Sequence, residues 1–138
     1  MNFRCAAKAL IYHQGSILVI KRRPNDVHRP AEWDIPGGRM EPGENPYDAL
    51  AREAREEIKM DIEIILPIEV QHFVRQDGQK IALTIFLCTA ESDTATLSEE
   101  HTEYRWLNLQ TEKNQFPAWI QTAIEKLVTQ QLLKAINS

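Results

Sequence analysis

The sequence has few cysteines, no long apolar run and little concentrated positive charge. Among its 138 residues are two cysteines, Cys5 and Cys88, which lie far apart and in no spacing typical of metal ligands. Disulfide frameworks and cysteine metal sites need several cysteines at short, regular spacings. We therefore expect two buried free thiols, as in a protein of the reducing cytoplasm.

The apolar segments are too short for a membrane protein. None approaches the roughly 18 residues that a membrane-spanning helix needs, and residues 1–10 lack the apolar stretch and cleavage site of a signal peptide. We expect no membrane contact and a cytoplasmic location. The length and the 43% content of hydrophobic residues predict a single domain over residues 1–138 with an ordinary core.

The charge balance argues against a long nucleic acid as partner. The formal net charge is −4, and the one basic cluster is Lys21, Arg22 and Arg23. A duplex is usually held by a much longer basic stripe, whereas three basic residues suffice for the phosphates of one nucleotide. We expect a small nucleotide-type substrate, and an acidic protein that handles phosphates needs a cation to do so.

The order of predicted elements indicates an α/β or α+β sandwich, in which helices cover a mixed sheet. Alternating and apolar runs predict strands, Gly-containing polar segments predict hairpin turns, and Asn45 followed by Pro46 predicts the start of a helix. The predicted strands are 3–12, 16–22, 62–75, 80–90 and 103–108, a loop covers 24–32, a short extended piece covers 33–41, and the helices are 46–58 and 117–135.

Both predicted helices have an apolar face. In the first, Asp48 can complete the capping pattern that Asn45 begins. The packing residues of this helix are Tyr47, Leu50, Ala51, Ala54 and Ile58, and those of the second are Trp119, Ala123, Leu127 and Leu133.

A second face of the first helix is acidic. Glu53, Glu56 and Glu57 are spaced i, i+3 and i+4, so their charges repel, and Glu56 and Glu57 stand in the last turn, where the helix dipole disfavours negative charge. A divalent cation such as Mg²⁺ would compensate, because it takes hard oxygen ligands. The alternative is a solvated acidic face paired with Arg52 and Arg55.

Two glycines, Gly37 and Gly38, precede this helix. Glycines mostly serve tight turns that need positive φ, but they also let backbone groups approach a metal or a phosphate. Because this loop leads directly to the acidic helix, both roles can hold at once.

The segment Gly38–Met60 resembles the Nudix box, the signature of MutT-like hydrolases of nucleoside diphosphate-linked compounds. The positions that match its spacing are Gly38, Glu44, Arg52, Glu53, Glu56, Glu57 and Met60, and residues 33–37 (WDIPG) resemble the usual lead-in. Ala54 replaces a larger aliphatic residue, and Lys59 replaces the glycine that ends the helix. A left-handed Lys59 would cost on the order of 1 kcal/mol.

The resemblance implies a Nudix-type α/β/α sandwich, a mixed sheet flanked by the box helix and a C-terminal helix. It implies that Glu53, Glu56 and Glu57, with a carbonyl of Gly37 or Gly38, bind Mg²⁺, with Mn²⁺ as the alternative ion. The metal would neutralise the diphosphate and polarise an attacking water. Arg52 would orient a glutamate and pair with Glu44.

The general base varies across the family. It is either a box glutamate or a glutamate of a late loop, here Glu100 or Glu99. The alternative for this loop is an acidic surface turn, and we expect His101 to be a surface loop residue.

Four residues are candidates for substrate binding. Gly38 and Arg23 are positioned for phosphates, although Arg23 also fits an ordinary solvated strand end. Trp33 and Phe73 could each stack on a base or belong to the core. Trp106 and Trp119 are assigned to the core and the C-terminal helix.

The resemblance implies hydrolysis of a diphosphate linkage, for which we favour a nucleoside or deoxynucleoside triphosphate cut to monophosphate and pyrophosphate. The downstream proline typical of ADP-ribose hydrolases is absent, since residues 74–76 read VRQ. The alternatives are a nucleotide-sugar or ADP-ribose type hydrolase, a non-catalytic nucleotide-sensing Nudix domain, and an acidic interaction module. Many relatives are homodimers, which leaves a homodimer open here.

Overall fold

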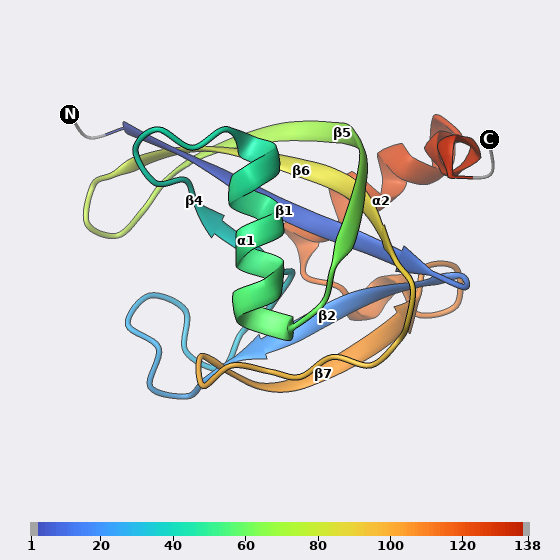
Figure 1. Ribbon diagram of the computed structural model, residues 1–138, viewed down its shortest axis with the longest axis horizontal. Helices are drawn as coiled ribbons and strands as arrows, with labels where there is room; N and C mark the ends of the chain where they lie inside the picture. The colour runs from blue at the N-terminus through green and yellow to red at the C-terminus, as the bar shows by residue number, and fades with distance from the viewer. Residues whose placement is uncertain (1–2, 137–138) are drawn as a thin grey trace.

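The computed structural model describes residues 3–136, and it places a mixed seven-stranded sheet between two helices. Helix α1 (Pro46–Ile58) lies in front of the sheet and helix α2 (Ala118–Thr129) lies behind it (Figure 1). The expected α/β sandwich is confirmed. The strands are β1 (Phe3–His13), β2 (Ser16–Arg22), β3 (Trp33–Asp34), β4 (Gly37–Arg39), β5 (Ile62–Val74), β6 (Lys80–Ala90) and β7 (His101–Asn108), and the 3-10 helices are η1 (Lys113–Gln115) and η2 (Leu132–Ala135).

Strand β1 is the centre of the sheet. The strand order is β3-β2-β1-β6-β5, with β4 paired to β1 and β7 paired to β2. β1 runs parallel to β6 and antiparallel to β2 and β4. In the β1–β4 pair, Gly37 lies opposite Lys8 and Gly38 lies opposite Ala7, so the glycine pair is fixed against the middle of the sheet.

The side chains of β1 alternate between two cores, as the period of a strand requires. Leu10 packs with Ile120 and Ile124 of α2, whereas Ile11 packs with Leu50 of α1. These side chains are fully buried, and each contributes roughly 1.5 to 3 kcal/mol to stability relative to an exposed position. Burial of the sheet on both faces holds α1 in a fixed place. Within residues 3–136, neither helix has the length and apolarity of a membrane span.

Helix α1 begins as predicted. The Asn45 side chain accepts the backbone N–H of Asp48 at 2.9 Å, and the Asp48 carboxylate accepts from Asn45 Nδ2, also at 2.9 Å. Of the predicted packing face, Leu50, Ala54 and Ile58 are buried and Ala51 is half-buried, whereas Tyr47 is 53% exposed. It stands in the first turn at the margin of the face, where its ring still contacts Phe86 at a centroid distance of 5.4 Å.

Two further expectations need correction. Cys88 is buried, but Cys5 is exposed, because it lies near the start of β1, two residues from the exposed Phe3. The second predicted helix, 117–135, ends at Thr129. Gln131 adopts a left-handed conformation with φ 54°, which interrupts the helix and turns Leu133 of η2 back onto the α2 core.

Lys59, the residue before the end of the box, departs from the pattern at a strained position, and its substitution should stabilise the protein. Lys59 adopts the left-handed conformation, with φ 56° and ψ 40°. Lys59→Gly should raise the free energy of unfolding by roughly 0.5 to 1 kcal/mol, because glycine lacks the Cβ that makes this conformation unfavourable. Urea denaturation measures the change. Lys59→Ala is the matched control, since it also loses the bond from Lys59 Nζ to the Glu56 carbonyl but keeps the strain; an equal gain in both variants would contradict the explanation.

Candidate functional site

The glycine pair brings the backbone of β4 against both β1 and α1. Gly37 has φ +134°, and a Cβ there would lie 2.2 Å from the Ala7 carbonyl oxygen, so only glycine fits. Its N–H donates to Glu57 Oε1 at 2.7 Å. A Cβ on Gly38 would lie 3.1 Å from Glu53 Oε1. The loop therefore serves as a tight turn and also allows two box glutamates to lie directly against the backbone.

These two glutamates are short of compensating positive charge. Glu57 is 7% exposed, and this burial raises its pKa to about 8, with Lys8 and the Gly37 N–H opposing the shift. Burial also raises the pKa of Glu53, and the charges of Glu56 and Glu100 add to the effect. A bound cation would oppose these upward shifts by favouring the charged form of each carboxyl group.

The late loop folds back onto the end of α1 and brings Glu100 to the site. The Ser98 N–H donates to the Glu57 carbonyl at 3.0 Å, and the Arg23 N–H donates to the Glu100 carbonyl at 2.9 Å. A bulge between Lys21 and Arg22 lets Arg22 pair with His101. Strand β7 therefore begins at His101 rather than at residue 103 as predicted.

His101 is part of the site, and its predicted role as a surface loop residue is wrong. It is 6% exposed, and its Nδ1 is buried without a hydrogen-bond partner. Burial lowers its pKa to about 4, so the imidazole is neutral near pH 7. Within residues 3–136, one ligand atom from each of Glu57, Glu100 and His101 lies within 4.8 Å of the others.

Arg52 gathers the outer carboxylates of the box. Its Nε and NH2 donate to the two oxygens of Glu44 at 2.8 and 2.9 Å, which confirms the expected pairing, and these bonds lower the pKa of Glu44 to about 2. Its NH1 lies 3.4 Å from Glu53 and 3.2 Å from Glu56. The three box glutamates thus face different partners, and their joint role as metal ligands stays a prediction.

Sequence reasoning missed a buried ion-pair network beside the acidic cluster. Asp34 is 1% exposed and accepts two 2.8 Å bonds from Lys8, with Arg22 at 3.0 Å and Arg29 at 2.8 Å. Burial alone would raise the pKa of Asp34, but the charges of Lys8 and Arg29 bring it below its usual range. The available signal was Lys8 itself, a charged residue on the same face of β1 as the buried Ala6 and Leu10.

The expected substrate-binding residues do not all lie together. Arg23 is at the site, and its Nε is buried without a partner. Trp33 is on β3 and Phe73 is on β5, the two ends of the strand order, so they are separated by roughly 19 Å of sheet and cannot hold one base between them. The Trp33 ring is already covered by Arg105, at 5.1 Å, and Lys21, at 5.9 Å, whereas Phe73 is 42% exposed.

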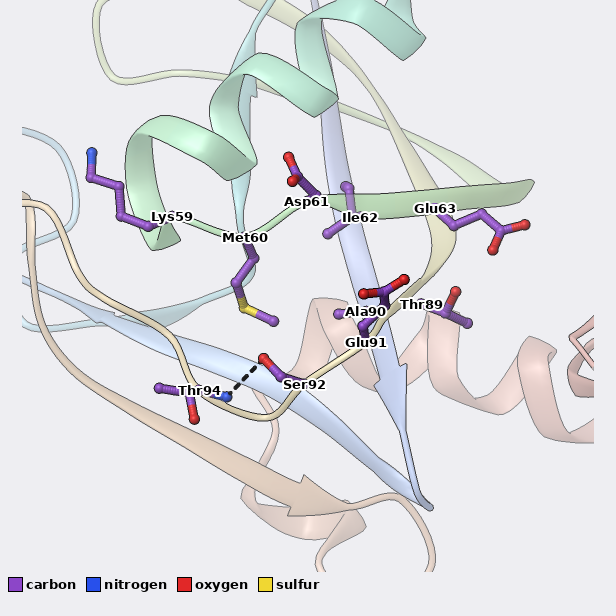
Figure 2. A pocket seen from close by; sticks show the side chains of 10 residues that line it. All are labelled: Lys59, Met60, Asp61, Ile62, Glu63, Thr89, Ala90, Glu91, Ser92 and Thr94. Carbon is purple, nitrogen blue, oxygen red and sulfur yellow. Dashed lines mark hydrogen bonds between the residues drawn. The ribbon is translucent and has the colours of Figure 1, made fainter.

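A cavity of about 490 Å³ lies beside the end of α1, and neither Gly37 nor Gly38 lines it. Figure 2 shows its lining side chains, among them Lys59, Asp61 and Glu91, drawn from the end of α1, the start of β5 and the end of β6. None of the predicted site residues lines it. The candidate functional site at the glycine pair is therefore separate from this cavity.

Sequence comparisons agree with this geometry. A family model described as NUDIX domain matches residues 2–127. A nucleoside triphosphatase NudI from Escherichia fergusonii is 32% identical over 120 residues, which cover 80% of this chain and 85% of that protein. NudI from Escherichia coli K12 is 31% identical over 117 residues, which cover 78% of this chain and 83% of that protein.

Solved structures share the fold. A MutT protein from Methanosarcina mazei Go1 superposes with a TM-score of 0.82 at 25% identity, covering 94% of this chain and 95% of that one. An Ap4A hydrolase from C. elegans, solved as a binary complex, superposes with a TM-score of 0.76 at 22% identity, covering 94% and 98%.

The Asp34 network should be required for stability. Asp34→Asn should lower the free energy of unfolding by about 3 kcal/mol or more, because Lys8 would remain buried without its counter-ion. Chemical denaturation measures the loss. Asp77→Asn, which removes the exposed partner of Arg75, is the control and should change stability little; similar effects of the two variants would contradict a special role for Asp34.

The burial of Glu57 should make the metal-free protein less stable as pH rises. The folded state keeps a proton on Glu57 up to about pH 8, whereas an unfolded glutamate releases it near pH 4.3. The free energy of unfolding should therefore fall between these two pH values, and Glu57→Gln should remove that decline.

Thermal melts in EDTA between pH 5 and 8 measure this difference. The buried His101 contributes a slope of opposite sign below about pH 6.5, but it is present in both proteins. Glu63→Gln, an exposed glutamate on β5, should follow the wild type. Parallel curves for wild type and Glu57→Gln would show that Glu57 is not desolvated in the folded protein.

Proposed function

Because the chain belongs to the Nudix family and is a Nudix hydrolase, we propose that it cuts a nucleoside or deoxynucleoside triphosphate to the monophosphate and pyrophosphate. The observation that carries the proposal is the acidic cluster at the glycine pair, where Glu53 and the buried Glu57 lie against the backbone and Glu100 lies beside them. The NudI relatives, named as nucleoside triphosphatases, support this substrate class.

The residues present fit a divalent cation. Family members depend on such ions, and the site here supplies hard oxygen donors whose charge burial leaves uncompensated. In our proposal Mg²⁺ is held by Glu53, Glu57 and Glu100, with Glu56 and a carbonyl of Gly37 or Gly38 completing the expected set. When bound, the ion neutralises diphosphate charge and lowers the pKa of a water.

Two arginines have separate roles in this proposal. Arg52 holds Glu44 through two hydrogen bonds and contacts Glu53 and Glu56, so it orients carboxylates rather than substrate. Arg23 is fixed to the Glu100 carbonyl through its backbone and has a buried Nε without a partner. In our proposal the terminal nitrogens of this guanidinium bind a substrate phosphate.

Glu100 is our choice of general base, and because a carboxylate has two oxygens, one can face the ion while the other accepts a proton from the water. Its carboxylate is exposed yet lies within 4.8 Å of a Glu57 oxygen, so it can reach both solvent and the acidic cluster. A base must lie within hydrogen-bond reach of the water that it deprotonates. The other late-loop candidate, Glu99, is also exposed but is absent from this cluster of ligand atoms.

A substrate panel tests the proposal. Purified protein with Mg²⁺ should release pyrophosphate from at least one nucleoside triphosphate faster than it cuts nucleotide sugars, ADP-ribose or dinucleoside polyphosphates. Glu57→Gln should lower kcat by about 100-fold or more without lowering the melting temperature, while Glu63→Gln should keep wild-type activity. Tight nucleotide binding without turnover would instead indicate a sensing domain, and faster cleavage of ADP-ribose would assign a different substrate.

A further inference from the structure

The most unusual feature of the acidic cluster is that a histidine completes it. Glu57, Glu100 and His101 come from α1, the late loop and the start of β7, and their ligand atoms lie within 4.8 Å of one another. Two consecutive residues, Glu100 and His101, thus meet a side chain of α1 in one small volume. The group differs from the glutamates expected from the box, which all come from one helix.

The His101 side chain gives a second and independent indication of a ligand. Its residue is 6% exposed, and Nδ1 is buried with no hydrogen-bond partner in the described part of the chain. Buried polar atoms are nearly always satisfied, so an exception indicates a missing partner such as an ion or a water. Lys8, the one buried lysine among residues 3–136, already donates to both oxygens of Asp34.

The geometry is compatible with one ion. Donors that lie 2.0 to 2.2 Å from a metal are at most about 4.4 Å apart, and 4.8 Å is the upper limit of the separations here. Glu100 is exposed, so a small rotation of its side chain can close the remaining gap. Glu57 and His101 are both buried and need not move far.

We propose that Glu57, Glu100 and His101 form a mixed oxygen–nitrogen site for a first-row transition-metal dication, which this chain binds in preference to Mg²⁺. An imidazole suits transition metals, whereas Mg²⁺ favours an all-oxygen set and keeps several waters. The inference rests on the proposed function for the presence of a cation at the acidic cluster. It adds the nitrogen ligand and the metal preference that follows from it.

Pulsed EPR of the Mn²⁺-loaded protein tests the nitrogen ligand directly. The wild type should show nitrogen coupling to Mn²⁺ that changes when the histidines carry ¹⁵N. His101→Gln should lose this coupling, and His72→Gln, which changes an exposed histidine of β5 in the same way, should keep it. No coupling in the wild type, or coupling that survives in a folded His101→Gln variant, would overturn the proposal.

Metal affinity gives a second readout that does not depend on catalysis. Titration calorimetry should find Co²⁺ bound at least tenfold more tightly than Mg²⁺ by the wild type, and His101→Gln should lose most of that ratio by weakening Co²⁺ binding. If His101→Gln fails to fold, NMR of the wild type takes the place of the variant: the ¹⁵N chemical shift of the His101 ring should change when Zn²⁺ is added. An unchanged chemical shift would overturn the proposal.

The two proposals can fail separately. Pyrophosphate release with Mg²⁺ and no nitrogen coupling would leave the proposed function standing and remove His101 from the metal site. Nitrogen coupling without cleavage of any substrate in the panel would support the mixed site and contradict the proposed function.

Discussion

The close approach of Gly37 to β1 is the constraint on which the site depends. Any side chain at this position would collide with the Ala7 carbonyl, and the Gly37 N–H donates to the Glu57 carboxylate. This one bond ties the sheet to the last turn of α1, where negative charge is unfavourable for the helix itself. Packing of the apolar face of α1 offsets this unfavourable charge. The helix can therefore keep glutamates where its own preference would place lysines.

Two buried clusters of opposite composition lie side by side and share Lys8. Asp34 has three cationic partners, whereas Glu53 has Arg52 alone and Glu57 has no ion pair among residues 3–136. Lys8 lowers the pKa of Asp34 and opposes the upward shifts of Glu53 and Glu57. A buried carboxylate whose charge is fully compensated by cations, such as Asp34, forms a structural ion-pair network. A buried group with excess negative charge fits a site for a cation. The contrast explains why stability should depend on Asp34 and activity on Glu57.

Sequence reasoning found what depends on local spacing. The α1 helix with its Asn45 cap, the Arg52–Glu44 pair and the left-handed Lys59 all follow from residues close together in the chain. It missed His101 and Asp34 because their burial depends on long-range register. His101 enters the sheet only through the bulge after Lys21, and a one-residue change of register moves a strand residue to the opposite face. The early end of α2 depends on the conformation of Gln131, which no motif marks.

The contrast between local spacing and long-range placement also explains why the reaction can be inferred more firmly than the substrate. The groups that would act on a diphosphate lie on β4, α1 and the start of β7, and β1 fixes β4 while β2 fixes β7. The aromatic residues that could recognise a base lie on β3 and β5, the two ends of the strand order. One of them, Trp33, already has cations over its ring. A fold of this kind can keep its phosphate chemistry while its outer elements change, and base specificity then depends on side chains that no motif in the box constrains.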